Sequence, residues 1–502
     1  MEAIDVDGAC AAGYAESARH AVEFVAACFR SAHRDVGRPG PKSMYLPGDR
    51  LSNSALLTDL YQLTMIQAYW LERLYDEAVF SLFVRRLPTG RNFLLACGLE
   101  DALEYLETVR FTQDELDYLG RRPEFQEPFV RWLADFRFRG EVRAVPEGTP
   151  VFAGESILEV AAPLAEAQLV ETLVLNQVHL QTALASKAAR VVLAARGRTV
   201  VDFGMRRMHG TDAALKGSRA FFIAGVSATS NVLAGQVYGI PIAGTMAHSY
   251  IQVHASELDA FRAFSAIYPE TTLLVDTYDT LEGVRRVIQL AEEQGADFRV
   301  RAIRLDSGDL GALALEARAM LDSAGLGQVR IFASGGLDEN EVARLVDQDA
   351  PIDAFGVGTA MGVSADAPTL DMVYKLTQYA GSGRLKLSPG KAVLPGPKQI
   401  FREEADGTAL RDVIACASEE RPGRALLGPA MQQGRRLLAG KVALHQTREY
   451  AAEQLARLPS GLRSLAPADP PYPVEISAGL TELTREVAGE VATGNRMEGN
   501  RT

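Results

Sequence analysis

The stretch that decides the fold class is Ala302-Ile303-Arg304-Leu305-Asp306-Ser307-Gly308-Asp309, a largely apolar run that ends in acidic and small residues. Five further runs follow the same order and each precedes helix-like sequence, at residues 199–204, 240–245, 273–277, 330–336 and 352–359. Apolar strands that alternate with helices are typical of a parallel sheet covered on both faces. The pattern predicts an α/β fold. Six runs favour an irregular, TIM-like α/β barrel, although spacing alone leaves an open sheet as the alternative.

The sequence around these runs divides into segments of different character. We expect an N-terminal extension of unknown role at residues 1–50, the first part of an α+β domain at 51–165 and the barrel at 166–374. A return to the α+β domain at 375–480 and a frayed polar tail at 481–502 follow. The α+β domain would then be discontinuous, because it is built from N-terminal and C-terminal segments. Within the extension, Ser17 to His33 has the apolar spacing of an amphipathic helix.

Composition excludes several classes of protein. The 502 residues are 47% hydrophobic and 23% charged, as in a globular chain. The net charge of -12, from 52 Lys and Arg against 64 Asp and Glu, gives no basic footprint for nucleic acid, so an anion must be bound at a local site. Four scattered cysteines, an acidic N-terminus and no apolar run of about 18 residues predict a cytoplasmic protein without membrane spans.

Polar residues at the ends of the predicted strands form a candidate phosphate site. Aspartates end two adjacent runs at Asp276, Asp279, Asp306 and Asp309, and Gly-rich turns end two more at Ser334, Gly335, Gly336, Gly356, Gly358 and Thr359. Glycine lets a phosphate approach free backbone N–H groups, and paired turns at the last strands of a barrel are a common phosphate cradle. Carboxylates suit Mg²⁺ that arrives with a pyrophosphate, so we expect Mg²⁺ near Asp306 and Asp309.

Three arginines and two histidines are further candidates. Arg206 and Arg207 follow one strand end and Arg304 lies inside another strand, where bidentate pairing with a substrate carboxylate or phosphate competes with an internal salt bridge to a nearby aspartate. His248 and His209 both follow strand ends. The residues alone do not separate these two histidines.

Several motifs, taken together, resemble the nicotinate phosphoribosyltransferases of the type II phosphoribosyltransferase family. The first is Leu56-Leu57-Thr58-Asp59-Leu60-Tyr61-Gln62-Leu63-Thr64-Met65. It is followed in order by Phe83-Val84-Arg85-Arg86-Leu87-Pro88, Ser230-Asn231-Val232-Leu233-Ala234-Gly235, Gly244-Thr245-Met246-Ala247-His248-Ser249, Leu305-Asp306-Ser307-Gly308-Asp309-Leu310, Gly356-Val357-Gly358-Thr359 and Val373-Tyr374-Lys375-Leu376. The likeness covers roughly residues 52 to 440.

The resemblance implies a reaction in which nicotinate attacks phosphoribosyl pyrophosphate to give nicotinate mononucleotide and pyrophosphate, with coupled ATP hydrolysis and Mg²⁺. It implies that the phosphorylated histidine of the Gly-Thr-x-Ala-His motif is His248, not His209. It further implies that Tyr61 stacks on nicotinate across a homodimer interface. Thr245 and Arg304 would contact nicotinate, and Thr359 the ribose phosphate.

Three other functions are alternatives. A nicotinamide phosphoribosyltransferase is the nearest, but similar nicotinamide enzymes have an acidic residue near Ser230-Asn231, where this chain has Asn231. A non-catalytic sensor of NAD precursors would be expected to lack catalytic groups that are present here. A phosphate-binding barrel lyase or oxidoreductase would usually need a Schiff-base lysine or a flavin. No lysine lies between Lys216 and Lys375, which excludes a Schiff base on these strand ends.

Overall fold

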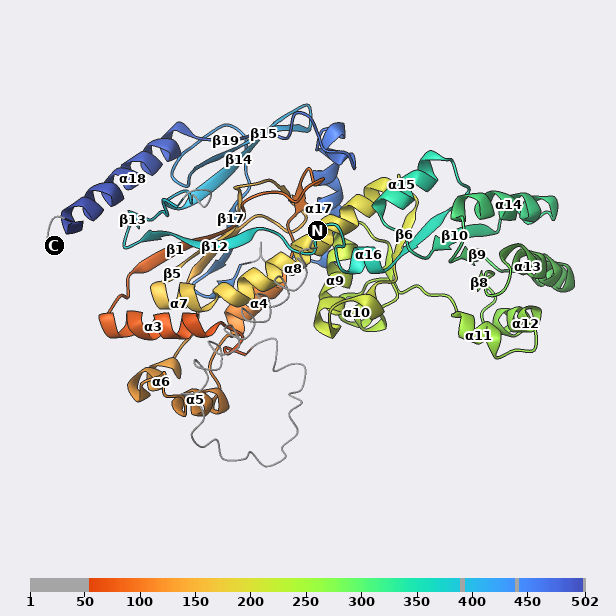
Figure 1. The fold of residues 1–502 in the computed structure, drawn as a ribbon, viewed down its shortest axis with the longest axis horizontal. Helices are drawn as coiled ribbons and strands as arrows, with labels where there is room; N and C mark the ends of the chain where they lie inside the picture. The colour runs from red at the N-terminus through yellow and green to blue at the C-terminus, as the bar shows by residue number, and fades with distance from the viewer. Residues whose placement is uncertain (1–53, 389–392, 438–441, 500–502) are drawn as a thin grey trace, which may run out of the picture. The chain divides into compact units, whose positions relative to one another are not determined.

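The structure is a computed structural model that describes residues 54–388, 393–437 and 442–499, with side chains described as far as residue 493 (Figure 1). The extension at residues 1–50 and the helix expected over Ser17–His33 lie outside the described residues. Those that are described belong to one compact unit.

A six-stranded, all-parallel sheet carries the predicted strand ends. Its order is β7 (Ala228–Thr229), β6 (Thr199–Asp202), β11 (Ala354–Val357), β10 (Arg330–Ser334), β9 (Ala302–Leu305) and β8 (Thr272–Leu274). Within the described residues no ladder joins β7 to β8, so the sheet is an open half-barrel where a barrel was expected. The run at residues 240–245 contributes only a single bridge, between Ile242 and Thr229.

Helices follow these strands, as the alternation predicts. They are α9 (Thr211–Ile223), α10 (Val232–Tyr238), α11 (His248–Gln252), α12 (Glu257–Ile267), α13 (Thr280–Gln294), α14 (Leu310–Ser323), α15 (Glu339–Asp347) and α16 (Thr359–Gly362). The buried strand residues and the apolar faces of α13, α14 and α15 form one hydrophobic core. The α/β class is therefore confirmed.

A second sheet, mainly antiparallel, combines strands from both sides of the parallel sheet in the sequence. Its order is β13 (Ser382–Gly383), β12 (Met372–Tyr379), β1 (Glu77–Val84), β5 (Ser156–Pro163), β3 (Glu141–Ala144), β17 (Gly428–Gln432) and β18 (Arg435–Arg436). At its centre β1 pairs with β5 on one side and with β12 on the other, with Phe80 opposite Val160 and Leu376.

The remaining elements surround this sheet. They are α3 (Leu60–Glu72), β2 (Leu94–Leu95), α4 (Leu99–Thr108), α5 (Gln113–Gly120), α6 (Glu127–Leu133), β4 (Pro150–Val151), α7 (Leu164–Leu169), β14 (Lys398–Ala405), β15 (Thr408–Cys416), β16 (Arg424–Ala425), α17 (Leu444–Ala456), β19 (Val474–Ile476) and α18 (Ala478–Gly499). Helix α18 occupies the segment where a frayed tail was expected. In the part of the chain that the structure describes, no helix combines the length and apolarity needed to cross a membrane.

Helix α8 (Glu171–Ala194) links the two sheets. It packs against β12 and α4 beside the antiparallel sheet and against α9, α15 and α16 beside the parallel one (Figure 1). Its 24 residues span about 36 Å at 1.5 Å per residue, long enough to reach both. Its C-terminal half also buries Lys187, a charged residue whose partners are described below.

Candidate active site

Arg304 lies at the centre of the strand-end cluster. From β9 its Nη1 donates to the hydroxyl of Thr245, and its Nη2 lies 3.9 Å from Oδ1 of Asp306. The side chain is 12% exposed, and its Nε is buried with no hydrogen-bond partner. Burial lowers the pKa of Arg304, and the carboxylates of Asp306 and Asp276 partly oppose that effect. A buried guanidinium with an unused donor is suited to an anionic ligand.

His248 is the first residue of α11 and faces the same cluster. Its Nδ1 lies 3.2 Å from Oγ1 of Thr277, and its Nε2 lies 3.8 Å from Oδ2 of Asp306. The side chain is 41% exposed, so solvent and a ligand reach it. His209, in contrast, is exposed, and its ring has no hydrogen-bond or ion-pair partner among the described residues.

Asp276, Asp306 and Ser334 join the ends of β8, β9 and β10. Oδ2 of Asp276 accepts hydrogen bonds from the backbone N–H of Asp306 at 3.1 Å and from the hydroxyl of Ser307 at 2.6 Å. Oδ1 of Asp306 accepts from the hydroxyl of Ser334. Oδ1 of Asp276 is buried without a hydrogen-bond partner, so this carboxylate retains an unused acceptor.

The other two predicted aspartates cap helices. Asp279 accepts from the backbone N–H of Glu282 at 2.8 Å at the start of α13. Asp309 accepts from the N–H groups of Gly311 at 3.1 Å and Ala312 at 3.3 Å at the start of α14. Aspartate is a preferred residue at this position, so capping alone accounts for both residue types.

The two Gly-rich turns lie at the ends of β10 and β11. Gly335 has φ +89°, and a Cβ there would come within 1.8 Å of the carbonyl oxygen of Asp306, so only glycine fits. A Cβ on Gly356 would come within 2.7 Å of the Phe203 ring. Gly336 and Gly358 complete the turns, and Thr359 is exposed at the start of α16. Close packing therefore fixes the backbone of both turns.

Three predicted residues lie outside this hydrogen-bonded cluster. Arg206 and Arg207 are exposed on the short 3-10 turn after β6, although the charge of Arg206 is near enough to lower the pKa of Arg304. Tyr61 is on α3, 48% exposed, and burial together with Glu171 raises its pKa to about 12. Within the described residues Tyr61 has no hydrogen bond to the strand-end cluster.

Two buried side chains beside the site, Asp202 and Asn231, were not predicted as site residues from the sequence. Asp202 ends β6, is fully buried, and accepts from the N–H of Gly204 at 2.7 Å and the hydroxyl of Thr229 at 2.7 Å. Burial raises its pKa, and these hydrogen bonds oppose the rise. Asn231 is 2% exposed and caps α10 through the N–H of Ala234. The one available signal was the position of Asp202, which ends its run as Asp276 does.

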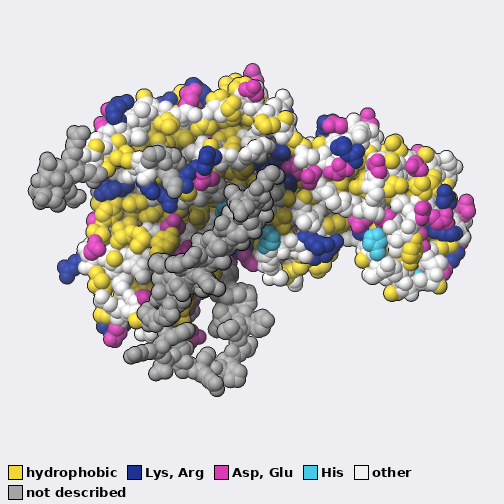
Figure 2. All heavy atoms as spheres, viewed as in Figure 1, with side chains coloured by type: hydrophobic (Ala, Val, Ile, Leu, Met, Phe, Trp, Pro, Cys, Tyr) yellow, Lys and Arg dark blue, Asp and Glu magenta, His cyan; other side chains and the backbone are white. Residues whose placement is uncertain are grey.

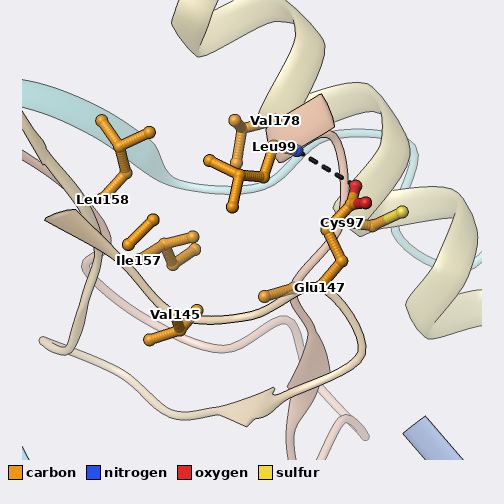
Figure 3. Close-up of a pocket in the computed structure, with 9 residues that line it drawn as sticks. Cys97, Leu99, Val145, Glu147, Ile157, Leu158 and Val178 are labelled. Atoms are coloured by element: carbon orange, nitrogen blue, oxygen red, sulfur yellow. Dashed lines mark hydrogen bonds between the residues drawn. The ribbon is translucent and has the colours of Figure 1, made fainter. Parts of the chain in front are cut away.

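The hollow drawn in Figure 3 belongs to another part of the fold. It is a small cavity of about 10 Å³, room for about one water molecule, lined by Cys97, Glu147, Val178 and neighbouring apolar residues. Glu147 accepts from the N–H of Leu99 and pairs with Arg219, and burial raises the pKa of Cys97 well above its usual value. The hollow therefore offers a neutral thiol and a paired carboxylate. In Figure 2, Lys and Arg side chains lie interspersed with Asp and Glu.

Comparison with known proteins gives the family. Residues 56–179 match the N-terminal domain of nicotinate phosphoribosyltransferase (NAPRTase), and residues 199–400 match the NAPRTase family. The nicotinate phosphoribosyltransferase pncB2 of Mycobacterium tuberculosis (strain H37Rv) is 55% identical over 86% of this chain and 93% of its own. That of Bacillus subtilis is 42% identical over 73% and 77%.

Solved structures agree. The crystal structure of human nicotinic acid phosphoribosyltransferase has a TM-score of 0.75 at 30% identity, covering 86% of this chain and 99% of that one. A nicotinate-nucleotide pyrophosphorylase from Pyrococcus furiosus shares the fold. Its TM-score is 0.68 at 24% identity, covering 83% of this chain and 99% of that one. With both family models matched in order and relatives aligned over most of its length, the chain belongs to the nicotinate phosphoribosyltransferase family.

Proposed function

We propose that the chain condenses nicotinate with 5-phosphoribosyl 1-pyrophosphate to give nicotinate mononucleotide and pyrophosphate, in NAD salvage. Family membership supports the reaction class. The observation that carries the assignment is the buried Arg304, whose free Nε and contact with Thr245 offer a carboxylate a charged donor beside a hydroxyl. A neutral nicotinamide would offer the unused Nε no charged acceptor, whereas the nicotinate carboxylate does, which favours the acid.

The chain's residues would act by position and charge. The ring nitrogen of nicotinate forms a bond to C1 of the ribose while the bond from C1 to the pyrophosphate oxygen breaks and its electron pair leaves with pyrophosphate. The nitrogen already carries a lone pair, so the step needs no general base. Arg304 would hold the carboxylate so that the nitrogen points at C1, and the turns at residues 334–336 and 356–359 would hold the phosphoribosyl phosphate.

The residues fit a magnesium ion that arrives with pyrophosphate. Among the described residues no group of three or more His, Cys, Asp or Glu gathers as a metal site, so the protein alone would not cage the ion. Asp276 has a buried acceptor oxygen without a partner, and Asp306 is next to it. We assign the ion to these two carboxylates, with Asp309 at the edge, and it would supply positive charge to the leaving group.

ATP coupling would run through His248. The Nε2 lone pair would attack the γ-phosphorus of ATP, ADP would leave with the electron pair of the broken P–O bond, and water would later release the phosphate from the histidine. The contact between Nδ1 and Thr277 supports this, because a proton held on Nδ1 leaves Nε2 free as the nucleophile. The added negative charge lies beside Asp306 and would reorder the local electrostatics.

Tyr61 would act across a homodimer. It is exposed on α3 beside Leu60, which is 56% exposed, and Leu57, just before the helix, is 40% exposed; a second copy could cover this apolar group. We further propose a cytoplasmic enzyme in which residues 51–165 and 375–480 act as one discontinuous domain, since strands of both segments pair in one sheet.

A product assay tests this function. The full chain is incubated with phosphoribosyl pyrophosphate, Mg²⁺ and either nicotinate or nicotinamide, with and without ATP, and nucleotides are separated by chromatography and identified by mass. We expect nicotinate mononucleotide, formed faster with ATP. Faster product from nicotinamide would favour the alternative enzyme, and binding of nicotinate without product from either base would favour the sensor.

A further inference from the structure

A buried ion cluster joins the segments that follow the two Gly-rich turns. Lys187 on α8 is 2% exposed, and its Nζ contacts Oε2 of Glu339 and, at 2.8 Å, Oδ1 of Asp366. Glu339, itself 1% exposed, also accepts from Nε of Arg190 at 3.0 Å. Asp366 accepts from Arg91 through Nε at 2.9 Å and Nη2 at 3.0 Å. These five residues, the α8 cluster, join four segments of the chain.

The two carboxylates of the α8 cluster are placed just beyond the turns. Glu339 is the first residue of α15, which begins after the turn at residues 334–336. Asp366 follows α16, which begins after the turn at residues 356–358. Each carboxylate thus fixes the segment that leaves one turn. Of the five residues, Lys187 is the one that contacts both carboxylates, so it links the two segments that follow the turns.

Asp366 and the backbone before it are held in place by several contacts. Burial alone would raise the pKa of Asp366, but hydrogen bonds from Arg91 and Lys187 outweigh it and keep the pKa well below its usual range. Ser364, between α16 and Asp366, is 1% exposed, has φ +46° and accepts from Nη2 of Arg91 at 3.1 Å. A non-glycine residue in this conformation is retained only where its surroundings determine it.

Stability alone does not require this cluster. Taking charges out of water is costly, and apolar residues of similar volume are often at least as stabilising as a buried ion pair. In this cluster the ion pairs hold Glu339 and Asp366 on either side of one ammonium group. The backbone of Gly335 packs closely against the Asp306 carbonyl group and that of Gly356 against the Phe203 ring, which leaves both positions little room to shift. The position of the two turns relative to each other therefore depends on the α8 cluster.

We propose that Lys187 is a positioning residue that fixes the separation of the two Gly-rich turns and thereby the affinity for the phosphoribosyl phosphate. The inference deepens the proposed function and depends on the turns binding that phosphate. Lys187 does not itself reach the reacting atoms, since it is buried between α8, Glu339 and Asp366. Nicotinate, held by Arg304, is outside its influence.

The test is Lys187→Met, which keeps the length and removes the charge. We expect KM for phosphoribosyl pyrophosphate to rise about tenfold, equivalent to about 1.4 kcal/mol, while KM for nicotinate changes less than about twofold. Calorimetric titration of phosphoribosyl pyrophosphate with Mg²⁺ into the enzyme should show the same loss without turnover. An unchanged affinity for phosphoribosyl pyrophosphate would overturn the proposal.

Two further variants separate positioning from stability. Lys398 is a matched control, 2% exposed and paired with Glu159 at 3.3 Å in the antiparallel sheet, so Lys398→Met should lower the melting temperature and leave this affinity unchanged. The double variant Lys187→Met with Glu339→Gln removes both partners of the buried pair. Arg190 then donates to a neutral amide in place of a carboxylate, so the melting temperature should change again, whereas binding of phosphoribosyl pyrophosphate should stay as weak as in Lys187→Met.

The outcomes are distinct. Recovery of wild-type affinity in the double variant, or an equal loss in Lys398→Met, would show that Lys187 acts only through stability and would overturn the proposal. If the wild-type chain forms no nicotinate mononucleotide, the proposed function fails. The calorimetric comparison of the variants then still decides whether Lys187 controls binding of phosphoribosyl pyrophosphate.

Discussion

The Nδ1 atom of His248 lies 3.2 Å from the hydroxyl oxygen of Thr277, and this contact orients the imidazole ring so that its other nitrogen is turned to the site. The opposite nitrogen, Nε2, faces Asp306 across 3.8 Å and belongs to a side chain that is 41% exposed. A nucleophilic histidine needs one ring nitrogen held and the other accessible. Thr277 was not among the residues predicted from the sequence, yet it meets the first of these needs.

The first prediction concerns His248→Ala. We expect it to abolish phosphoenzyme formation and ATP hydrolysis but to leave slow, ATP-independent synthesis of nicotinate mononucleotide, because the transfer needs no general base. Labelled ATP and a product assay measure the two activities. His209→Ala is the control and should retain the phosphoenzyme, whereas label on His209 instead of His248 would refute the assignment.

Arg304→Lys is the second. The charge is kept but the planar guanidinium is lost, so nicotinate binding should weaken by about 1–3 kcal/mol, the range for a charge-assisted hydrogen bond. Binding of phosphoribosyl pyrophosphate should change less. Arg301→Lys, on an exposed arginine paired with Glu270, is the matched control and should change neither. An equal loss for both substrates in Arg304→Lys would indicate a structural role.

The local pattern of apolar residues predicted the parallel strands, because a strand that is buried on both faces is apolar along its own length. The runs that became β9 and β10 begin at the first residues of those strands, Ala302 and Arg330, and extend beyond their last residues, Leu305 and Ser334. The run at 240–245 was not distinguishable from them by composition, although Ile242 is 59% exposed and pairs only once. Whether a strand finds a partner on each side, and so whether a barrel closes, depends on contacts between distant segments.

The site shows the same division. Sequence placed Asp279, Asp306 and Asp309 at strand ends, but only the structure shows that Asp279 and Asp309 cap helices while Asp306 faces His248. An aspartate before a helix is compatible with either role. The partners of Asp202 could not be predicted either, because Thr229 reaches it from the neighbouring strand β7.

A third prediction separates the two roles of Asp309. Asp309→Ser keeps a good N-cap, so the free energy of unfolding should fall by only a few tenths of a kcal/mol, while Asp309→Ala should lose about 1 kcal/mol. If the carboxylate also assists the magnesium pyrophosphate, both variants should lose activity at low Mg²⁺. Full activity of the serine variant over a Mg²⁺ titration would limit Asp309 to capping.

The fourth prediction tests the shared site. A Tyr61→Ala chain and a His248→Ala chain, each impaired in ATP-coupled synthesis, are mixed under conditions that exchange subunits. If Tyr61 serves the partner's site, heterodimers contain one site with both residues intact and should recover part of the coupled activity. Differently tagged chains confirm that heterodimers form. Heterodimers without recovery would place Tyr61 outside the partner's site.

The last prediction is a pH dependence that arises at Glu257. This side chain is 8% exposed, and its Oε1 is buried without a hydrogen-bond partner. Burial raises the pKa of Glu257 to about 7. Arg286 opposes the rise, and the carboxylates of Asp276, Glu282 and Asp279 add to it. Between the usual pKa of about 4.5 and this raised pKa, the folded chain therefore keeps a proton on Glu257 that the unfolded chain has lost.

Between the unfolded pKa of about 4.5 and the folded pKa of about 7, folding binds a proton, so the free energy of unfolding falls as pH rises through this window. The total fall is on the order of 3 kcal/mol at most, since one pKa unit corresponds to about 1.4 kcal/mol. The Glu257→Gln side chain stays neutral at every pH, so its stability lacks this pH dependence. Denaturant unfolding at pH 5 and pH 8 should therefore show a variant that gains stability over the wild type at the higher pH. Glu316→Gln, on an exposed glutamate of α14, should follow the wild-type slope. A Glu257→Gln variant with that same slope would show that Glu257 is ionised in the folded chain throughout the window.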